Sequence, residues 1–404
     1  MDILMILVSI LALGVLVFVH ELGHFLFAKW NGVGVIEFAI GFGKPIYQRQ
    51  KGETVYSLRL IPLGGFVRML GDDPRDLLPK DPESEEESDP VEAISSEIHP
   101  LNIDDSDRSR WFLSKGFCPK AAIVFAGPLF NILFAIFLSF LSFSVFGRPA
   151  LVTEPIVGAT LPKYPAEKAG MLEDDRILSV NGVSVTTWED MAKSVAQSKG
   201  EELVLEIERP AKDPSSPLEH LSIELRGTQD SGELALLSGD DSKSFRIGVL
   251  PKTVRKPISI PEAAEASLYH IWRISSLTVR GLYGMIMGQV STDNIAGPIF
   301  IFHQGAEAAR TGVDRLIDFM IFLSVSLAIL NLLPIPILDG GHLLFFVIEA
   351  LRGAPVSISL QERAHQVGMA LLLLLMLFAV SNDVVRIFGL SGDAQENAAP
   401  ATNK

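Results

Sequence analysis

Long stretches without charge constrain this chain of 404 residues more than any other feature. A run of roughly 18 or more apolar residues is long enough to cross a hydrocarbon core of about 30 Å as a helix. Four stretches come near this length: Ile3–Val19, which continues to Lys29, Ala121–Phe146, which contains no charged residue, Phe319–Leu338, and Val367–Asn382, which is short unless it extends through Asp383 and Arg386. We therefore predict a membrane α-helical bundle of about four transmembrane helices.

The N-terminal stretch must be distinguished from a secretory signal peptide, which has a basic start and a small-x-small cleavage site. Its start contains Asp2 and no Lys or Arg, no such cleavage site follows, and the stretch leads directly into His20–His24. We therefore expect this helix to be retained.

Cysteine content and charge exclude several classes of function. Cys118 is the only cysteine, which excludes an intramolecular disulfide and a cysteine-based zinc finger or iron–sulfur cluster. Any metal must therefore be bound by histidines and carboxylates. The net charge of −14 argues against a nucleic-acid partner, because phosphate binding requires clustered Lys and Arg. Much of the negative charge lies in residues 72–107, which we interpret as a solvated, flexible insertion.

The loop between the first two spans begins with an ordered segment. Residues 54–69 (TVYSLRLIPLGGFVRM) mix β-branched and aromatic residues around Pro62, Gly64 and Gly65. This pattern predicts a membrane-associated β-hairpin or re-entrant loop over about 53–69. Irregular backbone at membrane depth requires protein or a water-filled cavity to satisfy its polar groups.

A second part of the chain has the composition of a soluble domain. Alternating residues at 202–208 (ELVLEIE) and 221–225 (LSIEL) predict strands, and residues 188–197 predict a helix. Residues 210–217 are polar and Pro-rich and are expected to form an exposed loop. These features predict an inserted α+β domain at 151–255, between an N-terminal membrane half at 1–150 and a C-terminal membrane half at 256–390.

The C-terminal half begins with a different kind of helix. Residues 261–287 are apolar but include Arg273 and Arg280, a pattern typical of an amphipathic helix that lies on the membrane or packs on the bundle. The small, polar residues 391–404 are expected to form a disordered tail.

Lysines decide the predicted orientation in the membrane. Lys29, Lys115 and Lys120 flank the loop between the first two spans, whereas the N-terminus has no Lys or Arg. The positive-inside rule places this loop, with its acidic insertion, in the cytoplasm, and the alternation of spans places the inserted domain outside. Arg148 is a contrary charge.

The sequence His20-Glu-Leu-Gly-His24 carries the clearest chemical signal. Residues four apart lie one turn apart on the same face of a helix, so both histidines can bind one metal ion. Glu21 lies next to the first ligand, where it can take a proton from a metal-bound water. The alternative is an interfacial anchor without metal. Ionisable groups at membrane depth are costly, which favours the metal site.

A catalytic zinc usually has a third protein ligand. Asp339, within residues 331–342 (NLLPIPILDGGH), is the candidate. At 1.5 Å per residue, His20 lies about 28 Å along the first span and Asp339 about 30 Å along the third. Both spans run in the same direction in the predicted topology, so the ligands are expected at one depth near the cytoplasmic face.

Residues around this aspartate suggest a local break in the helix. Pro334 and Pro336 are expected to interrupt or kink the third span, which would free carbonyl groups and open a route for water. Asn331 either hydrogen-bonds a substrate chain or caps the broken helix.

Two other polar residues are assigned to the structure of the bundle. Asn131, beside Gly127-Pro128, is interpreted as a helix–helix contact. His342 is interpreted as structural or as a neighbour of the ligands, because a fourth protein ligand would close the open position that a catalytic zinc needs.

Several motifs in a fixed order resemble the site-2 protease family of intramembrane zinc metalloproteases, and within it the bacterial regulator-of-sigma-E proteases. The motifs are HELGH at 20–24, IPLGGFVRML at 61–70, FAGPLFN at 125–131, AGP at 296–298 and LPIPILDGGH at 333–342. The resemblance covers most of the chain.

The inserted domain resembles a PDZ domain in residues 165–171 (PAEKAGM) and 175–182 (DRILSVNG). A PDZ domain binds an extended chain by adding it to a sheet edge. In this family such domains either bind peptides or act as size filters. The best-known members contain two PDZ domains in tandem, whereas this chain has room for one, and its acidic insertion is longer than expected.

The resemblance implies one Zn²⁺ per chain, with His20, His24 and Asp339 as ligands and Glu21 as general base. It implies cleavage of single-span membrane proteins of the anti-sigma-factor kind, after a first cut by an upstream site-1-type protease, in regulated intramembrane proteolysis. It further implies a bacterial inner membrane, an active site near the cytoplasmic face and a periplasmic PDZ-like domain. The hairpin would present the substrate as an added strand; Asn331, Gly64 and Gly65 are the candidate substrate-binding residues.

Two rival hypotheses remain at this stage. In the other HExxH class of membrane zinc peptidase, the third ligand is a downstream Glu on a helix, but no such helix is evident after His24 and Asp339 would have no role. A non-catalytic PDZ scaffold or membrane chaperone is the second. A scaffold has no physical need for buried ionisable groups, and four are present here.

Overall fold

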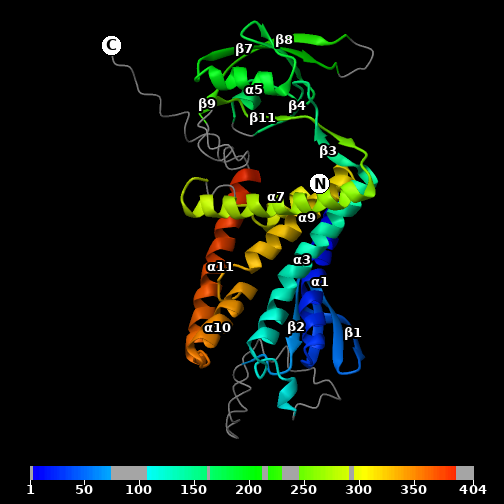
Figure 1. Ribbon diagram of the computed structural model, residues 1–404, viewed down its shortest axis with the longest axis vertical. Helices are drawn as coiled ribbons and strands as arrows, with labels where there is room; N and C mark the ends of the chain where they lie inside the picture. Colours follow the sequence, from blue (N-terminus) through cyan, green and yellow to red (C-terminus); the bar gives the residue numbers. More distant parts are fainter. Residues whose placement is uncertain are drawn as a thin grey trace, which may run out of the picture. The chain divides into compact units, whose positions relative to one another are not determined.

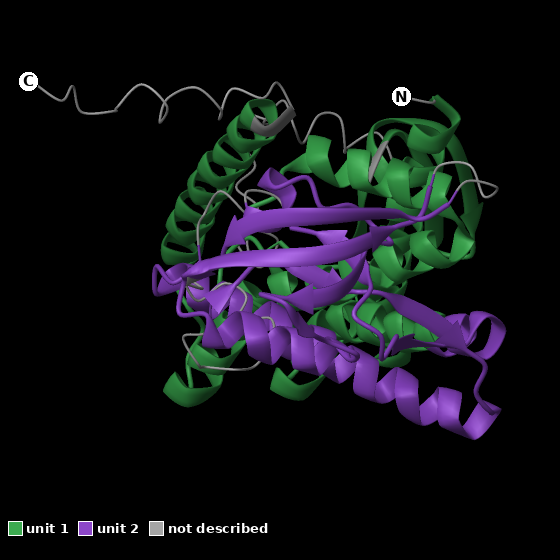
Figure 2. Cartoon of the chain, turned by 90° about the horizontal axis from the view of Figure 1, so that it is seen from above, with its two compact units in different colours: residues 1–139, 293–404 green, residues 140–292 purple. Residues whose placement is uncertain are grey.

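The computed structural model describes residues 3–73, 107–161, 164–211, 217–229, 245–290 and 295–387 (Figure 1). Most of the acidic insertion predicted at 72–107, the tail predicted at 391–404 and the centre of the loop predicted at 210–217 lie outside these residues. The chain forms two compact units, Met1–Ser139 with Asp293–Lys404, and Phe140–Thr292 (Figure 2).

Among the described residues, three helices are long and apolar enough to cross a membrane. They are α1 (Ile3–Trp30), α3 (Phe117–Phe146) and α11 (Ile358–Ile387), of which Ile358–Val385 forms the candidate span (Figure 1). Their positions match the first, second and fourth stretches of the sequence, and α11 begins well before the predicted Val367. The length of the apolar stretches in the sequence therefore predicts these three long helices.

The third predicted span is not one helix, which corrects the expectation for Phe319–Leu338. Helix α9 (Val313–Asn331) ends at Asn331, and α10 (Asp339–Arg352) begins a new helix, with α8 (Pro298–Thr311) preceding both. Pro334 and Pro336 lie in the break, where a proline cannot donate a helical hydrogen bond. Because α9 and α10 are separate helices, Asp339 does not lie about 30 Å along one continuous helix, as the sequence predicts.

A β-hairpin follows α1, and it is longer than predicted. Strand β1 (Val35–Lys51) pairs with β2 (Thr54–Met69) in an antiparallel ladder, and Gly52 adopts a left-handed φ of 64° at the turn. The residues predicted as a whole hairpin form only its second strand. Gly41, Gly43 and Pro45 interrupt the alternation in β1, which explains why the sequence pattern did not indicate this strand.

The centre of β1 has partners in two parts of β2. Residues from Phe38 to Ile40 pair with Val67 to Gly65 and also with Tyr56 to Leu58. The segment from Gly65 to Arg68 therefore forms an edge of the sheet, and no further strand in the described part of the chain pairs with it.

Inside the hairpin, buried Glu37 accepts hydrogen bonds from Ser57 Oγ (2.5 Å) and Arg59 (2.7 Å).

An ion-pair cluster fixes the end of α1 to the hairpin turn. Glu53 contacts both Lys29 of α1 and Arg110 of the 3₁₀ helix η2 (Arg108–Arg110). Partial burial raises the pKa of the Glu53 carboxyl, but the hydrogen bonds from Arg110 and Lys29 outweigh this and hold the pKa below its usual value.

The second unit contains the inserted α+β domain. Its four-stranded sheet has the order β6 (Val183–Ser184), β5 (Arg176–Val180), β7 (Glu202–Arg209) and β8 (Glu219–Arg226). Helices α4 (Pro165–Lys168) and α5 (Trp188–Gln197) contribute Ala166, Met191 and Val195 to the core of this unit. The helix predicted at 188–197 is confirmed, as are the strands predicted at 202–208 and 221–225.

Shorter strands and one long helix complete this unit. The pairs are β3 (Arg148–Leu151) with β12 (Thr253–Lys256), β4 (Val157–Thr160) with β11 (Val249–Pro251), and β9 (Thr228–Gln229) with β10 (Phe245–Arg246). Asn181 and Gly182 both have positive φ (52° and 75°), as a tight turn between β5 and β6 requires. Helix α7 (Ile260–Ile286) confirms the long helix predicted at 261–287.

We expect Glu53→Gln to lower the thermal stability of the protein near neutral pH, because it replaces the anion that Lys29 and Arg110 share. A carboxylate with a lowered folded-state pKa contributes stability above its unfolded pKa, and the contribution is lost as pH falls through the folded value. The destabilisation measured by thermal unfolding in detergent should therefore shrink as pH falls below about 4. A difference between variant and wild type that is independent of pH would contradict this role.

Candidate metal centre

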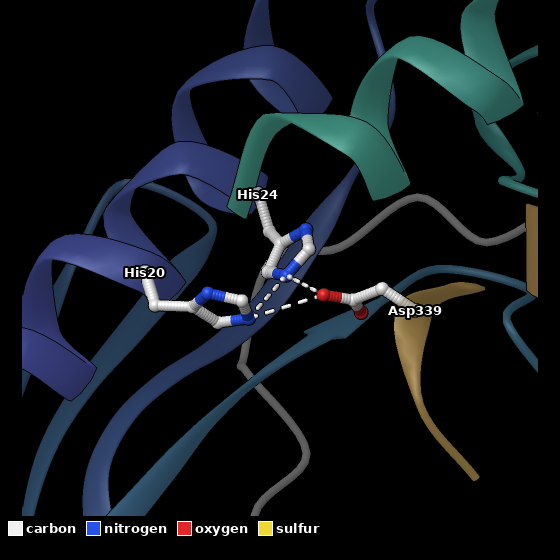
Figure 3. Close-up of side chains that lie close together, drawn as sticks. All are labelled: His20, His24 and Asp339. Carbon is white, nitrogen blue, oxygen red and sulfur yellow. Dashed lines mark hydrogen bonds and ion pairs between the residues drawn. The ribbon is translucent and has the colours of Figure 1, made fainter. Parts of the chain in front are cut away.

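Three side chains from two helices converge in the first unit (Figure 3). His20 and His24 come from α1, and Asp339 is the first residue of α10. His20 Nε2 lies 3.2 Å from His24 Nε2 and 3.1 Å from Asp339 Oδ2, and His24 Nε2 lies 3.5 Å from the same oxygen. The three atoms therefore form a nearly equilateral triangle.

The helical spacing of the two histidines produces half of this arrangement. One turn of α1 places the ring centroids 4.9 Å apart, and both residues are more than nine-tenths buried. They belong to the buried face of α1, together with Ser9, Ala12, Leu16, Gly23 and Ala28. Because most of α1 is apolar, the two imidazoles and the carboxyl group of Glu21 are its principal polar groups at this depth.

Two glycines let α1 and α3 approach closely beside the rings. A Cβ atom on Gly23 would overlap the carbonyl of Ala126, and one on Gly127 would overlap His24 Nε2 and the His20 ring. Small residues allow such close helix contacts inside a membrane. The space that the histidines occupy therefore exists because residue 127 has no side chain.

The break after α9 positions the third residue. The chain turns through residues 332–338, and Gly340 and Gly341 pack against the backbone of Leu332, Leu333 and Ile335, where any Cβ would overlap a carbonyl group. Asp339 thus lies at the N-terminus of α10, where the helix dipole favours a negative charge.

Hydrogen bonds orient both rings from behind. His24 Nδ1 lies 2.9 Å from the carbonyl oxygen of Ile123, and His20 Nδ1 lies 3.1 Å from the side-chain nitrogen of Asn131. Asn131 is fully buried. The sequence predicts only a helix–helix contact for Asn131; its position four residues after Gly127, on the same face of α3, is the signal that could have indicated more.

The three converging atoms fit a zinc ion. Bonds of about 2.1 Å at tetrahedral angles place ligand atoms about 3.4 Å apart, close to the three distances observed. In addition, Asp339 Oδ2 is buried and has no hydrogen-bond partner of good geometry among the described residues. A cation would satisfy this oxygen, and three protein ligands would leave one position open.

A cavity of about 910 Å³ opens beside these residues. Glu21, Gly65, Phe66 and Val67 lie in its wall together with both histidines and Asp339, so the edge of the hairpin borders the same space. Gly65 allows this approach, because a Cβ there would lie 2.9 Å from Glu21 Cγ.

Of the three residues predicted to bind substrate, Gly65 lies in the cavity wall, and Asn331 and Gly64 do not. Asn331 is not among its lining residues, but its side-chain nitrogen is 3.3 Å from His20 Nε2. Gly64 has a φ of 118° and packs on the ring of Phe42.

His342, interpreted as structural from the sequence, also lines the cavity, and its ring centroid lies 5.4 Å from that of His365 in α11. His365 was not identified from the sequence. It lies 23 residues beyond the last of the motifs, which ends at His342, so only packing brings it to this wall.

Comparison with known sequences gives consistent matches. Residues 8–375 match the sequence profile of peptidase family M50. A protein of Rhizobium meliloti is 34% identical over 382 residues, which is 93% of this chain and 95% of that protein. Zinc metalloprotease RasP of Geobacillus kaustophilus is 31% identical (94% of this chain, 97% of that protein), and regulator of sigma-W protease RasP of Bacillus subtilis is 30% identical (94% and 98%).

We expect Gly127→Ala to weaken zinc binding by about tenfold or more, because the added methyl group displaces the imidazoles from their converging positions. Zinc affinity measured by competition with a chromophoric chelator checks this. Gly14→Ala is the matched control, since a Cβ at Gly14 of α1 meets no atom within 4 Å. Equal loss of affinity in both variants would contradict the steric explanation.

Proposed function

Because this chain belongs to peptidase family M50, we propose that it is a membrane zinc metallopeptidase whose metal is held by His20, His24 and Asp339. The observation that carries the proposal is the triangle of three ligand atoms at zinc-like separations, next to a glutamate and an open cavity. The three candidate spans agree with a multi-pass membrane protein.

Glu21 is the proposed general base. It follows His20 directly and lies in the cavity wall, so a water molecule in the cavity can be within its reach. When bound, zinc supplies a Lewis acid that polarises the scissile carbonyl group and lowers the pKa of water. Glu21 accepts a proton from the attacking water and donates it to the leaving amide nitrogen.

The hairpin edge is the proposed substrate platform. Gly65, Phe66 and Val67 border the cavity, and β1 occupies only one side of this segment. An extended peptide that adds to such an edge gains backbone hydrogen bonds. It would then lie in the cavity next to the proposed metal ligands. This explains how a substrate helix could be unwound, because helical backbone bonds hide the peptide from attack.

The proposed substrates are single-span membrane proteins of the anti-sigma-factor kind, already shortened by an upstream site-1-type protease, in regulated intramembrane proteolysis. One relative is named as a regulator of sigma-W protease, which supports this class. We further propose a bacterial inner-membrane location, a fourth span built from α9 and α10, and a metal site near the cytoplasmic face.

The inserted domain is proposed to be a single periplasmic PDZ-like domain. The short helix α4, the turn at Asn181-Gly182 and the sheet β6-β5-β7-β8 support this assignment. It either binds an extended chain at a sheet edge or excludes substrates that are too large. The non-catalytic scaffold is the weaker proposal, because such a protein would not need the converging buried ligands.

We expect Glu21→Gln to bind zinc with wild-type stoichiometry and to cut a tagged single-span substrate about 10²- to 10⁴-fold more slowly, the usual range for loss of a general base. The assay uses purified protein in detergent, with metal content measured on the same samples. His24→Ala is the comparison that should lose both zinc and activity. Cleavage by Glu21→Gln at the wild-type rate would exclude Glu21 as the base.

We expect Asn331→Ala to reduce kcat/KM by roughly tenfold, through a higher KM, because a lost substrate hydrogen bond costs about 1 to 2 kcal/mol. Zinc content should not change. If Asn331→Ala instead loses zinc, its contact with His20 supports the metal site and the substrate role is wrong.

A further inference from the structure

Both histidines of the proposed metal centre need an acceptor behind the ring. An imidazole that binds a metal through Nε2 carries its hydrogen on Nδ1, and that N–H group must be satisfied when it is buried. His24 meets this need directly, because its Nδ1 lies 2.9 Å from the carbonyl oxygen of Ile123, a fixed acceptor.

The environment of His20 is different. Its Nδ1 faces a side-chain amide, Asn131 Nδ2, at 3.1 Å. A nitrogen that donates to Nδ1 corresponds to the tautomer in which Nε2 carries the hydrogen. Nε2 is the nitrogen that lies 3.1 Å from Asp339 Oδ2. That tautomer cannot use Nε2 as a metal ligand.

The other end of the same amide is unused. Asn131 Oδ1 is buried and has no hydrogen-bond partner among the described residues, although the residue is 0% exposed. A buried amide oxygen without a partner costs about 1 to 3 kcal/mol. A half-turn of the amide exchanges two groups of nearly equal size and brings Oδ1 to His20 Nδ1.

From these contacts we propose that Asn131 is the positioning residue for His20: its Oδ1 accepts the Nδ1–H hydrogen bond and thereby leaves Nε2 free for zinc. The inference rests on the proposed metal site and goes beyond it, because it assigns a function to a residue that does not touch the metal. The two ligands on α1 would then be oriented differently, His24 by backbone and His20 by a side chain.

The backbone around Asn131 is held in place independently of its side chain. Ser324 Oγ of α9 donates a hydrogen bond of 2.8 Å to the carbonyl oxygen of Asn131, and both residues are fully buried. This bond joins α9 to α3 at the residue that faces His20. The amide can therefore change its orientation while the Cα of Asn131 stays at a constant distance from the ring.

The test compares two substitutions of similar size with opposite chemistry. Asn131→Asp keeps an acceptor toward Nδ1, whereas Asn131→Leu fills the space without one. We expect Asn131→Leu to weaken zinc affinity 10- to 100-fold, the usual effect of removing a residue that orients a ligand, and Asn131→Asp to stay within about threefold of wild type or bind more tightly. A residue that only packs helices together predicts the reverse order, because Leu suits an apolar interface and a buried carboxylate does not.

Zinc affinity is measured on the full chain in detergent by competition with a chromophoric chelator, and the visible spectrum of the Co²⁺-loaded protein reports the geometry of the ligands. Asn31→Leu is the matched control, because among the described residues the Asn31 side-chain amide hydrogen-bonds only the Phe27 carbonyl near the end of α1, at 2.8 Å. Thermal unfolding of each metal-free variant shows whether it is folded.

We expect the Co²⁺ spectrum to change in Asn131→Leu and to be preserved in Asn131→Asp and Asn31→Leu. Wild-type zinc affinity in Asn131→Leu, or an equal loss in both Asn131 variants, would overturn the inference while leaving the metallopeptidase proposal intact. Failure of the wild-type protein to bind zinc would overturn both.

Discussion

The close crossing of α1 and α3 is the contact on which the metal centre depends. Gly23 meets the backbone of α3 at Ala126, and Gly127 leaves the space in which both imidazoles lie. Neither helix could approach as closely with a larger residue at these positions. In a bilayer there is little hydrophobic force between apolar helices, so packing at small residues is what brings such surfaces together.

That crossing also determines what lies behind the histidines. Ile123 and Asn131, two turns apart on α3, each face one ring through Nδ1. The rings are thus held between α3 on one side and the start of α10 on the other. The Nδ1 atoms of both rings have hydrogen-bond partners on α3, which reduces the cost of burying the rings away from water.

The break between α9 and α10 contributes the carboxylate and a path to it. A continuous helix would satisfy its own carbonyl groups, whereas the turn at 332–338 leaves backbone to be covered by Gly340 and Gly341. The helix N-terminus created by the break stabilises the charge of Asp339. The cavity wall then joins this aspartate to the edge of the hairpin, so that the ligands, Glu21 and an incomplete sheet border one space.

The sequence by itself determined the features that depend on local spacing. Hydrophobic length predicted the helices α1, α3 and α11, the four-residue interval predicted that His20 and His24 share a face, and the prolines predicted the break before Asp339. Motif order indicated the family. Each of these properties is encoded within one or two turns of chain, where the geometry is nearly fixed.

Only the tertiary structure decided which distant groups meet. Strand β1 was hidden by its glycines and proline, and becomes a strand because β2 pairs with it on both sides. Asn131 and His20 are 111 residues apart, and Asn331 and His20 are 311 apart. No periodicity encodes such contacts, because they arise from how helices pack at their small residues and where the chain turns.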